Sequence, residues 1–97
     1  MSKTTLSRDT ENDVYTAIAH PVRRDILRRL EQGDLSVKEM TQATPLTQSA
    51  VSQHLNILLE TGLVERERRG RRQIYQLRPQ RLREVYEWVS QFHDSWI

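Results

Sequence analysis

The sequence predicts a small, mostly α-helical domain with one β-hairpin near its C-terminal end. Three observations predict this fold class. Apolar residues recur at helical spacing in five segments, and proline, glycine and capping residues separate those segments. Two short segments with strand character flank a glycine between residues 63 and 77. The 97 residues suffice for one domain with a limited core, so help from a second copy would be unsurprising.

The first two predicted helices meet at His20-Pro21. Residues 1–10 are polar and aperiodic, which predicts a flexible tail before a single domain over residues 11–97. Apolar spacing predicts a first helix over 11–19. Pro21 suits the first position of a second helix, which Gly33 ends. The apolar stripe of this second helix comprises Val22, Ile26, Leu27 and Leu30.

A helix-turn-helix is predicted over residues 36–61. Ser36 and Glu39 have the spacing of a capping box, which starts a short third helix that ends before Pro45. Thr47 can cap a fourth helix over 47–61, which Gly62 closes. Two helices joined by a tight turn are typical of this motif.

The hairpin and the last helix follow. LVERE and QIYQL are predicted as strands on either side of RRGRR, with Gly70 at the tip of a loop of the longer kind, while the register stays open. Pro79 then opens one helix over about residues 79–96. Its apolar residues step by three, four, three and four, which is a heptad seam. They are Leu82, Val85, Val89, Phe92 and Trp96.

Composition narrows the function classes. The chain has no cysteine, which excludes disulfides, thiolate metal sites and thiol redox switches. No apolar run is long enough to predict a membrane span, and no signal peptide is visible. A cytoplasmic protein is therefore expected. Thirteen of the fifteen cations are arginine, and eight of these lie between Arg66 and Arg83, where Glu67 is the only acid. Such a run is often a solvated face, but the bias toward arginine also indicates a nucleic-acid partner.

The fourth helix has an unusual polar face. Between Glu39 and Glu60 the formal charge is zero with neutral histidine. On a helical wheel one arc is apolar, and the opposite arc contains Ser49, Ser52, Gln53, Asn56 and Glu60. Serine and asparagine are poor helix formers, so helix stability does not explain them. A face toward water or another protein is one explanation. The other explanation is a face that contacts base edges in a DNA major groove, which offer mixed hydrogen-bond donors and acceptors.

These segments resemble a known family. AIAHPVRRDILRRL and LSVKEMTQATPLTQSAVSQHLNILLETGLVERERRGRRQIYQL are similar to the winged helix-turn-helix of the ArsR-type bacterial repressors over roughly residues 12–95. The resemblance implies a DNA-binding repressor, not an enzyme. It implies base-reading or groove-entry roles for Gln48, Ser49, Ser52 and Gln53, with Asn56 marginal. Arg69, Arg71 and Arg72 of the wing would hold phosphates or enter the minor groove.

The resemblance also implies a homodimer formed through the first and last helices. We predict an interface that comprises Val14, Ile18, Leu82, Val85, Val89, Phe92 and Trp96. Part of this seam can instead pack on its own domain. Tyr86 and Trp88 widen the apolar surface of the last helix, which favours a two-fold partner. Such a dimer would read an inverted-repeat operator in double-stranded DNA.

Many members of that family sense metals, and the sequence departs from their pattern. The third helix lacks the paired cysteines of thiolate sensors. The last helix contains Glu84, Glu87, His93 and Asp94 without the paired spacing of the zinc-type site, so no metal or other cofactor is expected. His54 lies within the apolar arc, which predicts a packed or hydrogen-bonded histidine. The alternatives are a protein- or RNA-docking module and a repressor with an organic or metal effector at the dimer interface.

Overall fold

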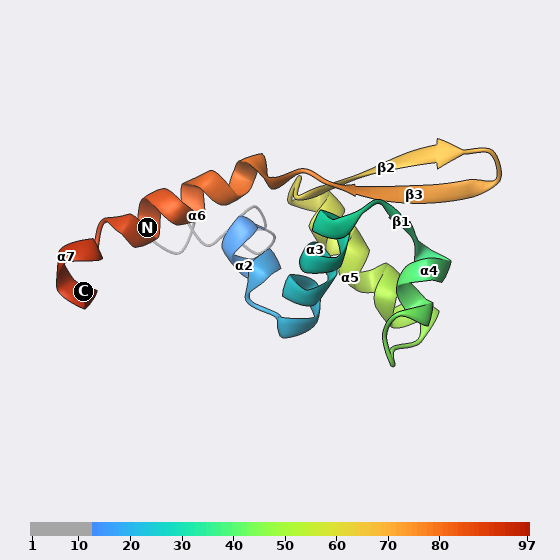
Figure 1. Cartoon of the computed structure of the whole chain (residues 1–97), viewed down its shortest axis with the longest axis horizontal. Helices are drawn as coiled ribbons and strands as arrows, with labels where there is room; N and C mark the ends of the chain where they lie inside the picture. The colour runs from blue at the N-terminus through green and yellow to red at the C-terminus, as the bar shows by residue number, and fades with distance from the viewer. Residues whose placement is uncertain (1–12) are drawn as a thin grey trace, which may run out of the picture.

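The computed structural model describes residues 13–97. In that range it contains six α-helices, one 3-10 helix and three strands (Figure 1). In chain order these are α2 (Val14–Ile18), α3 (Pro21–Gln32), β1 (Leu35–Ser36), α4 (Val37–Gln42), α5 (Gln48–Glu60), β2 (Val64–Arg69), β3 (Arg72–Leu77), the 3-10 turn η2 (Pro79–Arg81), α6 (Leu82–Ser90) and α7 (His93–Trp96). The predicted fold class is confirmed. The predicted tail and the first two residues of the predicted first helix lie outside the described residues.

Local capping explains where the central helices begin. His20 caps α3 through its Nδ1, which accepts a hydrogen bond from the Val22 amide at 3.1 Å, and Pro21 occupies the first helical position. The Ser36 hydroxyl accepts from the Glu39 amide at 3.1 Å, and the Glu39 carboxylate accepts from the Ser36 amide at 2.9 Å. This is the predicted capping box at the start of α4. Thr47 caps α5 in the same way, so the helix-turn-helix begins and ends as predicted.

The strands of the hairpin are longer than predicted, and the loop between them is shorter. Strands β2 and β3 pair antiparallel from Val64↔Leu77 to Arg69↔Arg72, so the connection has two residues, Gly70 and Arg71. The expectation of a longer loop was wrong. Gly70 has a φ of 64°, the left-handed conformation that a type II′ turn requires at its first central position, and this permits the short connection.

A third strand completes the sheet and was not predicted. The two residues of β1 pair antiparallel with β3, which gives the strand order β1-β3-β2. Two residues cannot show an alternating pattern, and Ser36 also has the spacing of a capping residue, so no separate strand signal is present in the sequence. The strand fixes the base of the wing to the entrance of α4.

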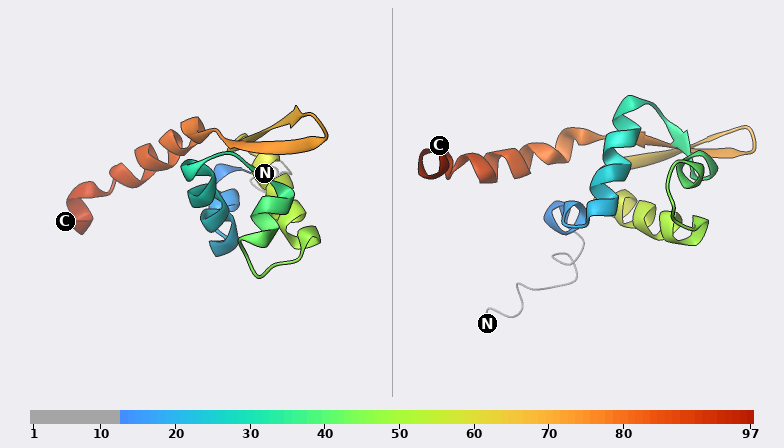
Figure 2. Two further views of the ribbon diagram at one scale, coloured as in Figure 1. Left: turned by 45° about the vertical axis from the view of Figure 1, so that its right-hand side comes forward. Right: turned by 60° about the horizontal axis from the view of Figure 1, so that its bottom comes forward.

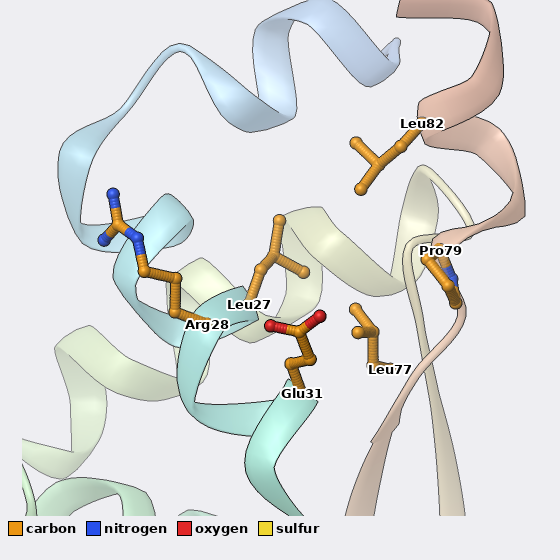
Figure 3. A pocket seen from close by; sticks show the side chains of 6 residues that line it. All are labelled: Leu27, Arg28, Glu31, Leu77, Pro79 and Leu82. Carbon is orange, nitrogen blue, oxygen red and sulfur yellow. The ribbon is translucent and has the colours of Figure 1, made fainter. Parts of the chain in front are cut away.

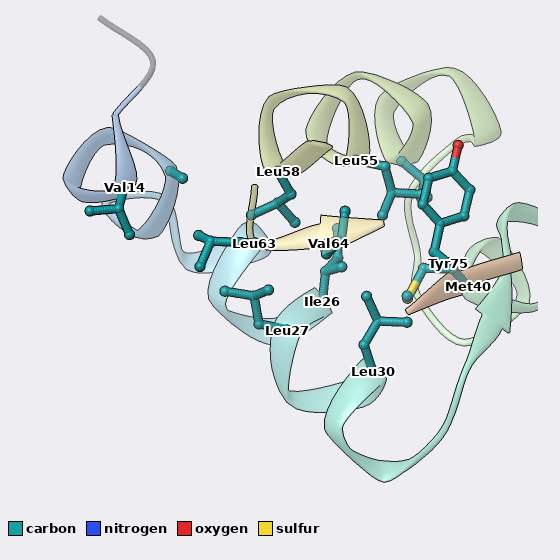
Figure 4. Packing of buried hydrophobic residues seen from close by; sticks show 12 residues of the cluster. Val14, Ile26, Leu27, Leu30, Met40, Leu55, Leu58, Leu63, Val64 and Tyr75 are labelled. Carbon is teal, nitrogen blue, oxygen red and sulfur yellow. The ribbon is translucent and has the colours of Figure 1, made fainter. Parts of the chain in front are cut away.

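One hydrophobic core holds α2, α3, α4, α5 and the base of the wing together. Figure 4 shows its side chains converging from these elements. The fully buried members include Val14, Ile26, Met40, Leu55, Leu58 and Leu63. Burial of a large aliphatic side chain contributes about 1.5–3 kcal/mol, so this cluster sets the orientation of the helix-turn-helix relative to the wing.

The last helix is interrupted, which corrects the prediction of one helix over residues 79–96. The chain forms η2, then α6, and breaks at Gln91 and Phe92 before α7. Phe92 has φ −102° and ψ 12°, and its amide donates to the Val89 carbonyl at 3.0 Å, which is a 3-10 bond rather than an α-helical one. The heptad seam is therefore continuous only as far as Ser90.

Candidate nucleic-acid interface

The two ends of the molecule extend in opposite directions from the core. In Figure 1 the wing projects to one side and α6–α7 to the other, and the two further views in Figure 2 show the same arrangement. Helices α4 and α5 lie below the wing, so the helix-turn-helix and the hairpin belong to the same side of the molecule. This side contains all the residues predicted to contact DNA.

Helix α5 turns its neutral polar residues away from the core. Its inner face buries Val51, Leu55 and Leu58. The residues predicted to read bases lie outside that face: Gln48, Ser49, Gln53 and Asn56 are exposed and Ser52 is half-buried. Among residues 13–97 none of these five side chains has a hydrogen-bond partner within the chain. Their donors and acceptors are therefore free for a partner molecule.

The predicted wing arginines differ in their surroundings. Arg69 Nη2 lies 3.1 Å from Asp34 Oδ2 and 2.9 Å from Glu67 Oε1, and these carboxylates raise the pKa of the guanidinium. Arg72 Nη2 lies 3.0 Å from Glu39 Oε1 and 3.3 Å from the Ser36 hydroxyl. Arg71, in the turn, forms no ion pair with any described residue. The three cations are thus not equivalent, and Arg71 is the one without a counter-ion.

The ion pairs also connect the wing to the body. Gln76 donates to Asp34 at 3.2 Å and to Glu67 at 3.1 Å, so β2, β3 and the loop before β1 share one polar network with Arg69. Glu39 joins the wing to α4 while it caps that helix. The Ser36 amide is the main cause of the lowered pKa of Glu39, and the Arg72 guanidinium adds to the effect. Exposed pairs are individually weak, but a connected network restricts the wing.

His54 faces the body of the protein rather than the exposed side of α5. Its Nδ1 lies 3.3 Å from Arg23 Nη1, and its ring stacks at a tilt on His20 with centroids 4.6 Å apart. Because a guanidinium only donates, Nδ1 must accept, and this requires neutral His54. Burial, followed by the charges of His20 and Arg23, lowers the pKa of His54. The interpretation of His54 as a hydrogen-bonded histidine fits this geometry.

Arg23 links α2 to α5 from within the core. Only 7% exposed, it donates from Nε to the Ala17 carbonyl at 2.8 Å and from Nη2 to the Thr16 carbonyl at 2.9 Å. Burial lowers the pKa of this guanidinium. The C-terminal carbonyls of α2 and the ring of His54 therefore share one buried cation, an arrangement that sequence analysis missed because its partners lie 6 to 31 residues away.

The predicted dimer residues divide into three groups by their burial. Val14 is completely buried in its own core and offers no surface, so we assign it to the core rather than to an interface. Ile18, Leu82 and Val85 are half-buried against that core. Leu82 also borders a cavity of about 220 Å³ between α3 and the start of α6, with Leu27, Leu77 and Pro79 (Figure 3). Beyond it Val89, Phe92 and Trp96 are 40%, 46% and 61% exposed.

The exposed part of α6 and α7 contains a large apolar patch. Tyr86, Trp88 and Ile97 add to the exposed residues of the seam. Edge-to-face contacts connect Tyr15, Trp88 and Phe92, with centroids 6.1 and 5.2 Å apart. Such a patch on a small protein is typical of a protein-binding surface. The break before α7 does not remove it.

The acidic residues of the last helices are largely engaged with neighbours. Glu84 pairs with Arg81 at 3.3 Å, Glu87 with Arg83 at 3.2 Å, and His93 Nδ1 lies 3.5 Å from Asp94 Oδ1. Within residues 13–97 no group of three or more histidine, cysteine, aspartate or glutamate side chains is placed to hold a metal ion. In the same range no helix has the length and apolarity that crossing a membrane would need.

An exposed hydrogen-bonding helix beside an arginine-containing hairpin defines the class of a winged helix-turn-helix DNA-binding protein. Residues 20–66 match the model of the bacterial regulatory protein arsR family. A transcriptional repressor of Bacillus subtilis, SdpR, is 31% identical over 81 residues, which are 84% of this chain and 90% of that protein. The chain belongs to the ArsR family and is a DNA-binding transcriptional regulator, not an enzyme.

Other relatives agree with this assignment. An HTH-type transcriptional regulator of Mycobacterium tuberculosis is 42% identical over 67% of this chain, although the match spans only 61% of that protein. The fold is similar to an ArsR-like transcriptional regulator from Rhodococcus, with a TM-score of 0.80, 26% identity and coverage of 99% and 86%. It is also similar to a homodimeric winged helix-turn-helix DNA-binding domain from Mycobacterium bovis, with a TM-score of 0.69, 32% identity and coverage of 94% and 86%.

Proposed function

We propose that this regulator is a homodimeric repressor that binds an inverted-repeat operator and blocks a promoter in the cytoplasm. The observation that carries the proposal is the exposed face of α5, whose neutral amides and hydroxyls have no partner in the described chain. We assign base reading and groove entry to Gln48, Ser49, Ser52 and Gln53, with Asn56 at the margin. Amides and hydroxyls match the mixed donors and acceptors of base edges, and no acid among them repels phosphates.

The wing supplies contacts that do not depend on sequence. We assign Arg69, Arg71 and Arg72 to the flanking phosphates or the minor groove. The ion pairs of Arg69 and Arg72 reduce the positive charge that these residues offer, so Arg71 contributes most of the attraction. Phosphate contacts position the protein, while α5 selects the sequence.

The second copy binds at the opposite end of the molecule. The relative from Mycobacterium bovis is homodimeric by its description, and the exposed residues of α6–α7 give this chain an apolar surface for the same purpose. A two-fold axis through this end places two copies of α5 in successive major grooves, roughly 34–36 Å apart. The interface comprises Ile18, Leu82, Val85, Val89, Phe92 and Trp96.

The proposed repressor does not use a metal ion for its regulation. The chain has no cysteine, and the candidate acids on α6 form ion pairs with arginine. An effector at the dimer interface remains the alternative regulatory scheme, and thermal melts with zinc and with a panel of small molecules test it. A melting temperature that rises with ligand concentration would contradict repression without an effector.

The decisive experiment is selection of duplexes from a randomised library, followed by fluorescence anisotropy with a selected duplex and its shuffled counterpart at about 150 mM salt. Non-specific binding is weak under these conditions, at roughly 10⁻⁴ to 10⁻⁶ M. The proposal predicts nanomolar binding to a selected inverted repeat and weak binding to the shuffled duplex. Equal, weak binding to all duplexes would contradict it and favour a protein- or RNA-docking module.

A further inference from the structure

A cleft between the helix-turn-helix and the turn of the wing is not explained by base reading. Its volume is about 330 Å³, and its walls come from the start of α4, the first residue of α5 and the beginning of β3. It is lined by Ser36, Val37, Lys38, Gln48, Arg71, Arg72 and Gln73. Among the lining residues are three cations and no carboxylate. This charge balance favours an anion.

Two of the three cations are available to a ligand. Lys38 and Arg71 are exposed, and neither forms an ion pair with a residue in the described part of the chain. They come from α4 and from the hairpin turn, so the cleft brings together charges that are 33 positions apart in the sequence. Gln48, Ser36 and Gln73 supply polar groups around them.

The third cation has a different role. Arg72 is held by Glu39 at 3.0 Å and by the Ser36 hydroxyl at 3.3 Å, so its guanidinium fixes β3 against α4. The Glu39 carboxylate is in turn fixed by the Ser36 amide at 2.9 Å. Arg72 therefore sets the distance between the two walls and keeps the cleft open between Lys38 and Arg71.

We propose that this cleft binds a phosphodiester of the DNA backbone, held by Lys38 and Arg71, with Arg72 as a positioning residue in its wall. The inference rests on the proposed function and adds Lys38 as a DNA contact. Gln48 belongs both to the cleft and to the exposed end of α5, so the bound phosphate is the one beside the major-groove bases that α5 reads. Binding here fixes how deeply α5 enters the groove.

The first test compares salt dependence among variants. Lys38→Gln should weaken binding to the selected and the shuffled duplex by a similar factor, roughly tenfold or less, and reduce the slope of log K against log salt by about 0.9 per protomer. Lys38→Arg keeps the charge and should restore most of the slope. Arg28→Gln removes an exposed charge near the start of α6, outside the cleft, and should leave the slope unchanged. Equal slopes for Lys38→Gln and Arg28→Gln would overturn the proposal.

The second test identifies the phosphate. Each phosphodiester of the selected duplex is replaced in turn by a neutral methylphosphonate, and binding of the wild type and of Lys38→Gln is measured. One position per half-site should weaken the wild type more than it weakens Lys38→Gln, because the variant has already lost one of the two cations that hold that phosphate. If every position weakens both proteins equally, no phosphate is bound by Lys38, and the cleft assignment is wrong.

The two proposals fail in different ways. A wild-type chain without preference for any sequence would contradict the proposed function, while the salt slopes on a random duplex would still decide the role of Lys38. Normal operator binding with no coupling between Lys38 and any methylphosphonate would contradict only the cleft. Circular dichroism of each variant verifies folding, and Lys38 is an exposed residue with no role in the core.

Discussion

The two ends of this molecule expose opposite chemistry on either side of one core. The wing and the starts of α4 and α5 present arginine, lysine, amides and hydroxyls, whereas α6 and α7 present Tyr86, Trp88, Phe92 and Trp96. Polar groups recognise a hydrated polyanion, and aromatic groups are stabilised by removal from water. The proposed function therefore assigns binding of DNA and pairing of protomers to separate surfaces, and single substitutions should separate the two functions.

The largest expected effect comes from a charge in the apolar end. Val89→Glu places a carboxylate among exposed apolar residues of α6, where a partner would bury it without a counter-ion. The variant should be monomeric by sedimentation velocity at concentrations at which the wild type is dimeric. Operator affinity should fall by about 10² or more, because the second half-site no longer binds with the first.

Ser90→Glu is the matched control for this substitution. It adds the same charge one position along α6, outside the heptad seam, and should leave the dimer intact. A dimeric Val89→Glu protein with normal operator affinity would show that the protomers pair elsewhere.

The second-largest expected effect is a loss of operator affinity from a substitution at the polar end of the molecule. Gln53→Ala removes an exposed amide from α5 and should cost about 1–3 kcal/mol on the operator, with little change on the shuffled duplex. Alanine is a better helix former than glutamine, so a loss of affinity would not arise from a weaker helix. Anisotropy titrations with both duplexes measure the difference. Equal weakening on both would remove Gln53 from the base-reading residues.

The third effect separates the wing from α5. Arg71→Ala should weaken all duplexes and reduce the salt slope by about 1 per protomer, because an unpaired guanidinium is lost. Arg69→Ala is the comparison, and its effect on the slope should be smaller, since two carboxylates already offset that charge. Titrations from about 50 to 300 mM salt measure both slopes. A larger reduction of the salt slope for Arg69→Ala would indicate that Arg69 leaves its ion pairs with Asp34 and Glu67 and contacts DNA instead.

Local chemistry made much of the fold predictable from sequence. The Ser36 and Glu39 capping box, the Thr47 cap and Pro21 at the first position of α3 all involve residues within three positions of each other. Two features were missed, one because it depends on a distant partner and one because it has no sequence signal. Strand β1 exists because it pairs with β3, about 38 residues further along the chain, and the break at Phe92 leaves no mark on the apolar spacing.

In the candidate site too, features set by residues close in the sequence were predictable, and contacts between distant residues were not. The wheel of residues 47–61 predicted which side chains of α5 are exposed, because periodicity and burial depend on one helix. The pairing of Arg69 with Asp34 and of Arg72 with Glu39 depends on how the wing folds over α4. Sequence reasoning treated the three wing arginines alike and passed over Lys38, since a single lysine on a short capped helix carries no pattern.

The smallest expected effect concerns the junction between the two ends, where His54 meets Arg23. A group whose pKa is lower in the folded than in the unfolded state contributes stability above its unfolded value, about 6.5 for histidine, and loses it as the pH falls through the folded value. The melting temperature should therefore fall between pH 7.5 and 5.5. In His54→Asn, whose amide oxygen can accept from Arg23 without titrating, the fall should be smaller by roughly a few degrees. Thermal melts by circular dichroism measure this difference, and an identical fall in both proteins would show that His54 does not couple the helices through its neutral form.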